Sequence, residues 1–284
     1  MSRGDVSNTL TEQVERLTAK SKARATAVSV HDLESGLRFS LRGDRWFHAA
    51  STIKVAVLLA LFRAVDDGRV RLDDSLHVRN RFISAADGSP FQLNRDSDAM
   101  PELYQAIGRT AKISALAEGM ISASSNLATN LLLDFLGVEY ARNVLRDAHV
   151  EGVELRRGVE DQVAHERGIN NEATADGLMT LLSSLRGDFL RSESKEQGIR
   201  ILLEQRFNSM IPAGLPPHAA VAHKTGEIST ACHDMGIVYL PEREPYIAVI
   251  LTEFDSENEG RRETVAAISE AIYRSVMGTQ GKIK

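Results

Sequence analysis

The chain has 284 residues, of which 43% are hydrophobic and 26% charged, an ordinary composition for a globular protein with a substantial core. The formal net charge of −5 argues against a nucleic-acid partner, because such proteins usually present a basic face. The single cysteine, Cys232, excludes an intrachain disulfide, and no stretch is apolar for the length that a bilayer requires.

The predicted elements begin with a helix over residues 8–21, in which Leu10, Val14 and Leu17 share one face. Two strands follow at 25–33 and 37–41, joined by a hairpin signal. The middle of the chain is helical by periodicity, and its clearest segments are 53–65, 113–120, 126–135, 140–148, 173–185 and 196–204. Strand patterns return at 220–228, 236–240 and 246–254, and an amphipathic helix closes the chain over 261–277.

Strands at both chain ends with helices between them predict an α/β fold of the α+β type. We expect one antiparallel sheet of about five strands, with flanking helices, built from residues 1–45 and 219–284. Residues 46–218 would form an all-helical subdomain inserted into it. The active site is expected at the junction, because small molecules often bind between two subdomains.

Three short motifs occur in order along this arrangement: Ser51-Thr52-Ile53-Lys54, Ser124-Ser125-Asn126 and Lys224-Thr225-Gly226. Each motif is weak alone, and the segment Ser192-Glu193-Ser194-Lys195 also fits Ser-x-x-Lys. That second match lies in charged, polar sequence, however, whereas Lys-Thr-Gly occurs once. The ordered set of three therefore indicates a serine nucleophile with lysine partners.

Ser51 precedes a run that is apolar almost all round, from Ile53 to Leu61, which predicts a buried helix. Lys54 within this helix is costly unless it has a partner or a task. Positions i and i+3 share a helix face, so we expect Lys54 beside the Ser51 hydroxyl, where a pKa lowered by burial would make it a base. The alternative is that Ser51 only caps the helix and that Lys54 extends to solvent.

Ser124 and Asn126 lie in a polar turn before another apolar helix. Serine and asparagine are preferred helix caps, so this turn fits either a simple helix start or a start whose Ser124 also faces the cleft.

Lys224 and Gly226 are poor strand formers within a predicted strand. Glycine in a strand lets a ligand or another backbone approach closely, so Lys224 and Thr225 are expected to hold an anionic group. The N–H of Glu227 would then complete an oxyanion hole. The alternative is an exposed edge strand protected by its lysine.

Together, the motifs and the strand–helix–strand plan resemble the serine β-lactamase and penicillin-binding-protein superfamily, closest to class A β-lactamases, over residues 20–277. The resemblance implies that Ser51 is acylated by the substrate carbonyl and that Lys54 accepts or relays its proton. It also implies roles for the other motif residues: proton transfer to the leaving nitrogen (Ser124), binding of the side-chain amide (Asn126), binding of the carboxylate (Lys224 and Thr225), and an oxyanion hole formed by the N–H groups of Ser51 and Glu227.

The chain departs from the class A pattern in its second motif, whose middle residue is usually aspartate and here is Ser125. The interval between the first two motifs is also longer than usual, and its residues 87–109 would form a lid or an interface.

A further departure from the class A pattern concerns the deacylating glutamate, which in class A lies in a Glu-x-x-x-Asn pattern on a loop. Alignment on the following helix puts this position at Val159, one residue from Glu160, and sets Arg157 and Glu172 near the usual ion pair of the loop. Glu166 fits the local pattern but lies too close to the next helix. Glu160 is the preferred base, and a loop without a functional base remains the alternative.

The leading hypothesis is a class A-like serine β-lactamase that hydrolyses the β-lactam amide through an acyl-enzyme on Ser51. The alternatives are a penicillin-binding D,D-peptidase or esterase with slow or absent deacylation, and a non-catalytic binding or sensor domain.

The expected partner is a small β-lactam or acyl-peptide substrate. No cofactor or metal is expected, because no zinc or phosphate-binding pattern occurs. The N-terminus lacks the apolar run of a secretory signal, which predicts a cytoplasmic location, or a periplasmic or secreted one if a leader has been removed. The sequence leaves the oligomeric state open.

Overall fold

The computed structural model describes residues 3–255 and 260–280. Its main sheet is antiparallel, in the order β10-β11-β12-β1-β2. The strands are β1 (Ala25–Asp32), β2 (Arg38–Leu41), β10 (Ala220–Ile228), β11 (Ala231–Tyr239) and β12 (Tyr246–Glu253). β1 pairs with β12, with Val28 opposite Ile250, so the two ends of the chain meet within the sheet. The predicted five-stranded sheet built from both chain ends is confirmed.

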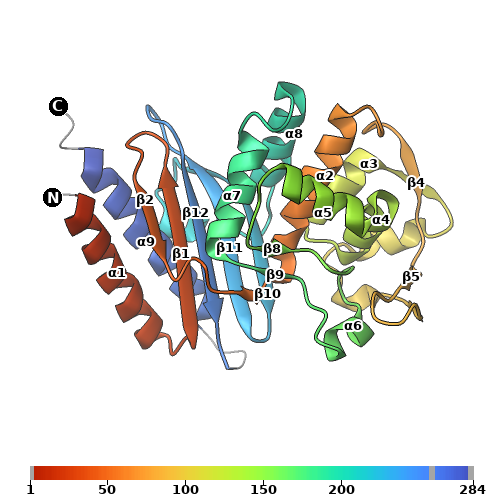
Figure 1. Ribbon diagram of the computed structural model, residues 1–284, viewed down its shortest axis with the longest axis horizontal. Helices are drawn as coiled ribbons and strands as arrows, with labels where there is room; N and C mark the ends of the chain where they lie inside the picture. Colours follow the sequence, from red (N-terminus) through yellow and green to blue (C-terminus); the bar gives the residue numbers. More distant parts are fainter. Residues whose placement is uncertain (1–2, 256–259, 281–284) are drawn as a thin grey trace.

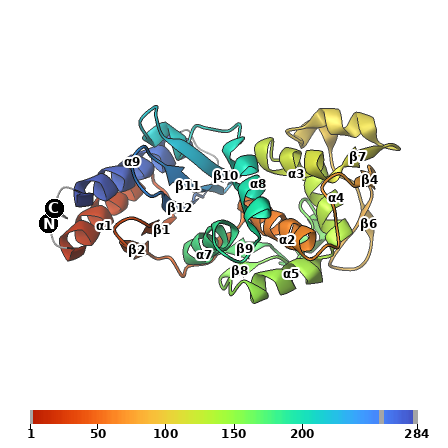
Figure 2. The same ribbon diagram turned by 90° about the horizontal axis from the view of Figure 1, so that it is seen from above.

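Helices cover both faces of this sheet (Figures 1 and 2). The terminal helices α1 (Arg3–Lys20) and α9 (Arg261–Gln280) lie side by side on one face, and α7 (Ala175–Arg186) packs against the other. β1 is therefore buried along nearly its whole length, including polar residues such as Thr26 and Ser29.

The inserted part of the chain is organised around α2 (Lys54–Asp66), which lies among the other helices at the right of Figure 2. Almost every residue of α2 is buried, as its uniformly apolar sequence predicts. Its helical neighbours are α3 (Ile113–Ser122), α4 (Asn126–Leu136), α5 (Val138–Asp147), α7 and α8 (Ser192–Leu203). The short elements of the insertion are α6 (Gln162–Glu166) and the 3-10 helices η1 (Ala50–Ile53), η2 (Arg95–Ser97), η3 (Pro101–Ala106) and η4 (Pro212–Gly214).

The insertion is not entirely helical, which corrects one detail of the sequence-based expectation. Three small sheets connect its helices: β3 (Phe47–His48) with β9 (Glu172–Ala173) and β8 (Val153–Glu154), β4 (Ser75–His77) with β7 (Thr110–Lys112), and β5 (Phe82–Ile83) with β6 (Pro90–Phe91). Strands of two or three residues are too short to show a period-two pattern in sequence.

Several predicted boundaries also differ from the structure, most of all the starts of α1, β11 and α8. α1 begins at Arg3 and not at residue 8. β11 begins at Ala231 and not at Gly236, because His233 and Asp234 are fully buried in the sheet although they are polar. The polar segment Ser192–Lys195 is the first turn of α8, where Ser194 Oγ donates to Asp66 Oδ1 at 2.6 Å. In the part of the chain that the structure describes, no helix combines the length and the apolarity needed to cross a membrane.

Candidate active site

The three motifs come from distant parts of the sequence and meet where the main sheet contacts the insertion. Ser51 lies in η1, directly before α2, and the second motif forms the turn between α3 and α4. Lys224, Thr225 and Gly226 lie on β10, the edge strand of the sheet that contacts η1. The predicted position of the site at this junction thus agrees with the geometry of the motifs.

The hydroxyl of Ser124 joins the three motifs. Lys224 Nζ donates to Ser124 Oγ at 3.0 Å, and Lys54 Nζ donates to the same oxygen at 3.2 Å. Both lysines are fully buried. Because a hydroxyl has two lone pairs and one hydrogen, an oxygen that accepts from both lysines keeps its own hydrogen to donate into the adjacent cavity.

Lys54 is further fixed by the second motif. Its Nζ donates to the carbonyl oxygen of Ser124 at 2.6 Å and to Asn126 Oδ1 at 2.7 Å. Burial lowers the pKa of Lys54 to about 7, although the negative charges of Asp98 and Glu160 act to raise it. A lysine with this pKa exchanges its proton near neutral pH, as a base must.

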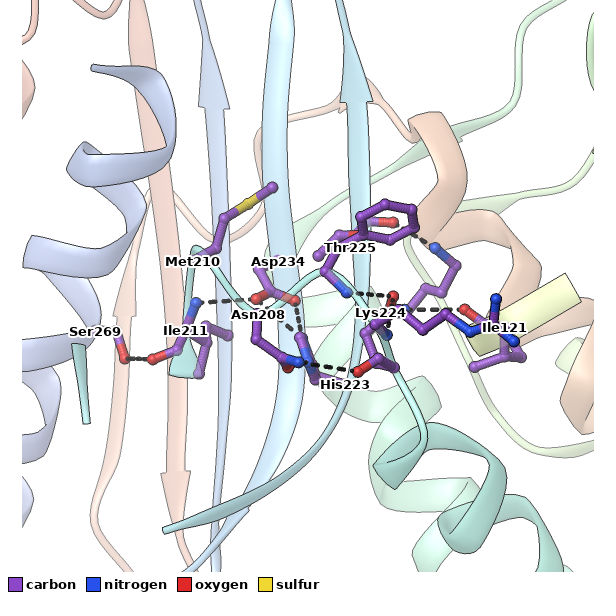
Figure 3. A network of polar contacts seen from close by, with 12 residues as sticks. Ile121, Asn208, Met210, Ile211, His223, Lys224, Thr225, Asp234 and Ser269 are labelled. Atoms are coloured by element: carbon purple, nitrogen blue, oxygen red, sulfur yellow. Dashed lines mark hydrogen bonds and ion pairs between the residues drawn. The ribbon is translucent and has the colours of Figure 1, made fainter. Parts of the chain in front are cut away.

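A polar network centred on the buried residues His223 and Asp234 lies next to Lys224 on β10 and β11 (Figure 3). His223 Nδ1 lies 3.0 Å from Asp234 Oδ1, and His223 Nε2 lies 3.0 Å from Asn208 Oδ1. The N–H of Ile211 donates to the other carboxylate oxygen of Asp234 at 3.0 Å. Burial lowers the pKa of Lys224 well below its ordinary value and the charge of Lys54 lowers it further, whereas Asp234 raises it. Asp234 thus provides the nearby negative charge and ties β10 to the segment before η4.

Gly226 lets β10 come very close to η1. A Cβ atom at this position would lie 3.0 Å from Thr52 Cγ2 and 3.1 Å from the backbone nitrogens of both Ser51 and Thr52. Any side chain here would push apart the two segments that carry the N–H groups of Ser51 and Glu227. Glycine is therefore required by the close backbone approach, as its presence in a strand suggests.

Ser51 and Glu227 line two adjoining cavities. The first, of about 180 Å³, is also lined by Ser124, Thr225 and Arg262, and the second, of about 310 Å³, by Asn126 and Glu160. Glu227 itself is neutralised by two arginines of α9, at 3.1 Å from Arg261 Nη2 and 2.8 Å from Arg262 Nη2. Ser51 can therefore be approached by a molecule that extends into cavities on both sides of it.

Glu160 is exposed to the larger cavity and contacts the second motif. Asn126 Nδ2 donates to Glu160 Oε1 at 2.5 Å. The pKa of Glu160 is raised above its ordinary value, chiefly because the side chain is partly desolvated, while the hydrogen bond from Asn126 opposes this shift. The charge of Asp98 also raises this pKa and the charge of Lys54 lowers it, each to a smaller extent. The structure thus brings Glu160, and not Glu166, to the other motif residues: Glu166 is exposed at the end of α6, where it accepts from Gln162 Nε2 at 3.0 Å.

The neighbours of Glu160 hold its loop in place. Asn130 on α4 accepts from the N–H of Val159 at 2.8 Å and donates to its carbonyl oxygen at 2.9 Å. The carboxylate of Asp161 accepts from Ser84 Oγ and from the N–H of Ala85, each at 2.8 Å. The residue between these two anchors is Glu160.

The ion pair expected for this loop is made by a different arginine. Glu172 lies 2.7 Å from Arg156 Nη1, whereas the guanidinium of Arg157 donates to the carbonyl oxygen of Ile169 at 2.7 Å and to Asn170 Oδ1 at 3.1 Å. The prediction for Arg157 was therefore wrong by one residue. Arg157 is buried beneath the loop and binds its backbone, while Arg156 reaches the partly exposed carboxylate.

Three residues at this site adopt a left-handed backbone conformation that is uncommon outside glycine. They are Ala50, Ser124 and Glu160, with φ angles of 47°, 58° and 57°. Such conformations cost about 1–3 kcal/mol each and concentrate where a side chain must be directed for function. Each of the three stands at or beside a predicted catalytic residue.

Sequence analysis did not identify Asn130, Asp161 or Asp234, which position the loop and the strand. None of them belongs to a motif, and each acts through a partner that lies far away in sequence. A buried-looking polar residue in an apolar stretch, such as Asn130 on α4, was the only signal that they carried.

Two buried lysines from separate segments are joined through the hydroxyl of Ser124, which lines the same cavity as Ser51. This is the arrangement that a serine acyl-transfer site requires. The chain belongs to the Beta-lactamase enzyme family, whose profile matches residues 9–276. The resemblance inferred from the three motifs is therefore confirmed.

Known relatives span most of the chain. The β-lactamase ROB-1 of Haemophilus influenzae is 27% identical over 256 residues, which cover 88% of this chain and 79% of the relative. Among solved structures, PBP-A is 27% identical with a TM-score of 0.81, covering 95% of this chain and 96% of that one. An ancestral class A β-lactamase is 26% identical with a TM-score of 0.81, covering 94% of this chain and 99% of that one. A PBP-A variant, at a TM-score of 0.80, was solved as an acyl-enzyme complex with penicillin G.

Proposed function

We propose that this protein is a serine β-lactamase of the class A type, which hydrolyses the β-lactam amide through an acyl-enzyme on Ser51. The observation that carries the proposal is the convergence of Lys54 and Lys224 on the hydroxyl of Ser124, beside Ser51 and at the meeting point of two cavities. Membership of the family and the penicillin acyl-enzyme of a PBP-A variant support the choice of substrate.

In acylation, neutral Lys54 accepts the proton of Ser51 as Ser51 Oγ attacks the carbonyl carbon of the lactam. The N–H groups of Ser51 and Glu227 stabilise the oxyanion that develops on the carbonyl oxygen. Ser124 donates its proton to the lactam nitrogen while the C–N bond breaks, and it regains a proton from Lys54. The result is an ester on Ser51 and a free amine in the opened ring.

The two cavities bind the two ends of the substrate. The smaller cavity takes the carboxylate next to the lactam nitrogen, with Lys224 and Thr225 as its partners and Arg262 at its rim. The larger cavity takes the acyl side chain, whose amide binds Asn126.

In deacylation, Glu160 accepts a proton from a water molecule that attacks the ester carbonyl. Ser51 Oγ leaves and takes up the proton that Glu160 accepted, passed on through Lys54, which releases the acid product and restores both Glu160 and Ser51. The hydrogen bond from Asn126 to Glu160 holds this carboxylate at the acyl side of the site.

A second candidate function is that of a penicillin-binding D,D-peptidase or esterase whose acyl-enzyme persists. The similarity to PBP-A, at 27% identity over 95% of this chain, favours keeping this alternative. It shares every acylation step with the first proposal and differs only in the contribution of Glu160.

Turnover of a chromogenic cephalosporin separates the two functions. A β-lactamase gives steady hydrolysis that is lost in Ser51→Ala, whereas the second function gives one equivalent of product followed by a stable adduct. Absence of both hydrolysis and adduct, with penicillins and with acyl esters alike, would contradict both and favour a binding or sensor role.

A further inference from the structure

A buried carboxylate from the long interval between the first two motifs contacts the second motif. Asp98 follows η2, and only 6% of its surface is exposed. Its Oδ2 accepts from the N–H of Leu127 at 2.8 Å and from Ser125 Oγ at 3.3 Å. Residues 87–109, expected as a lid or an interface, thus send one side chain inward to the start of α4.

The carboxylate of Asp98 accepts hydrogen bonds from four donors. Tyr104 Oη also donates to Oδ2, at 3.2 Å, and the N–H of Met100 donates to Oδ1 at 3.0 Å. Ser125 Oγ in turn accepts from the N–H of Ala128 at 3.2 Å and so caps α4. Asp98 therefore holds the N-terminus of α4, where a negative charge is favourable, through both the backbone and the cap.

The residues on either side of Ser125 are the ones that bind Lys54. A support that fixes Ser125 and Leu127 also fixes Ser124 and Asn126, which each accept a hydrogen bond from Lys54 Nζ. The titratable groups that feel the charge of Asp98 from the surrounding elements are Lys54 on α2, Tyr104 on η3 and Glu160 on the loop before α6. Asp98 is thus coupled to both proposed proton acceptors.

We propose that Asp98 is a positioning residue for the second motif, supplying from a separate segment the carboxylate that the class A pattern carries at the place of Ser125. This inference rests on the proposed acylation of Ser51. It explains why a serine stands in the middle of the motif: the buried space next to it is already occupied by a carboxylate, and two negative charges in contact would repel each other.

A carboxylate exchange tests the proposal, using four proteins: wild type, Asp98→Asn, Ser125→Asp and the double variant. Asparagine at 98 replaces one of two accepting oxygens by an amide donor that faces other donors, so we expect acylation by benzylpenicillin to slow at least about tenfold. Aspartate at 125 remains a good helix cap, so the double variant should recover most of the rate. Ser125→Asp alone should be impaired, because it places two carboxylates together.

Asp96→Asn is the matched control. This residue lies on the exposed surface of the same segment, so the variant should acylate like wild type.

The pH profile distinguishes this role from a general loss of structure. Asp98 raises the pKa of Lys54, so its neutralisation should move the acidic limb of the acylation profile to lower pH, and the double variant should move it back. The melting temperatures of the four proteins show, independently of activity, whether the exchange of the carboxylate preserves stability. Failure of Asp98→Asn to fold while the double variant folds and acylates would support the exchange.

Two results would overturn the proposal: wild-type acylation and pH profile in Asp98→Asn, or a double variant no better than Asp98→Asn. Both require that wild-type Ser51 forms the penicillin adduct. If it does not, the proposed function fails first, and the melting temperatures alone decide whether the carboxylate can be exchanged.

Discussion

Lys54 combines two properties that lysines on a protein surface do not have. It is fully buried, and burial brings its pKa to about 7, within reach of physiological pH. Its three hydrogen bonds all run to the second motif, so its Nζ is held in one place while its proton can be lost. These properties suit a group that must accept a proton from a serine and return it within one reaction cycle.

The pH dependence of acylation follows from this pKa. Above about pH 7 Lys54 is neutral and can act as a base; below it, protonation removes the base, and the rate should fall about tenfold per pH unit. The measurement is the rate of adduct formation on Ser51 across this range by quenched mass spectrometry, with Lys54→Ala as the variant that should form almost no adduct. Equal rates well above and well below pH 7, or rapid adduct formation in Lys54→Ala, would refute the role of this lysine.

At the scale of residues, the sequence predicted those site members that violate their local context. Lys54 in an apolar helix and Lys224 with Gly226 in a strand were unexpected enough to require a function. Asp98 and Asp234 could not be predicted, because each looks like an ordinary loop or strand residue until a remote partner is brought beside it. Arg157 was misassigned for a similar reason, since neighbouring arginines carry the same local pattern.

At the scale of elements, the site depends on how closely β10 approaches η1. The strand carries the N–H of Glu227 and η1 carries the N–H of Ser51, and only a residue without a Cβ fits between them. The proposed oxyanion hole thus depends on the contact between these two elements.

Gly226→Ala should therefore reduce acylation much more than stability. The added methyl group would separate β10 from η1 and displace one oxyanion donor, and loss of such a donor lowers the rate by about 100- to 1000-fold. The comparison is kcat/KM for a chromogenic cephalosporin, with the melting temperature measured in parallel. Gly278→Ala, whose added Cβ would meet no neighbouring atom, is the control and should retain full activity. Full activity in Gly226→Ala would show that the close approach has no part in catalysis.

The boundaries of the apolar elements were predicted well, and those of the polar ones, such as the start of α1, poorly. α2 was recognisable because it is apolar on every face, whereas the start of β11 was missed because His233 and Asp234 interrupt its apolar pattern. Both side chains are satisfied by partners outside the strand: His233 Nε2 lies 3.0 Å from the carbonyl oxygen of His48, and Asp234 binds His223. The sequence of one strand alone does not show that such partners exist on other segments.

At the scale of the whole molecule, one core extends across the division predicted at residues 45/46 and 218/219. A single cluster of buried side chains joins sheet residues such as Ala27 and Ile247 to helix residues such as Leu58, Leu131 and Leu178. A second cluster lies beneath α1 and α9 on the other face of the sheet. The sheet connects the two clusters, so the insertion has no core that is separate from the sheet.

We therefore expect the protein to unfold in a single transition. Scanning calorimetry should give equal calorimetric and van't Hoff enthalpies, because the shared core couples the sheet to the helices. Two separate transitions would mean that the insertion of residues 46–218 is an independent folding unit.

The proposed function requires two steps: acylation of Ser51 by a β-lactam, and release of the acyl group with Glu160 as the base. The most direct measurement is mass spectrometry after brief and after prolonged exposure to benzylpenicillin, for wild type, Glu160→Gln and the matched control Glu166→Gln. All three should carry one adduct on Ser51 at the early time. At the late time Glu160→Gln alone should retain it, since loss of a general base slows the step by about 100- to 10000-fold. Release from Glu160→Gln as fast as from wild type, or no adduct on Ser51 in any protein, would contradict this account.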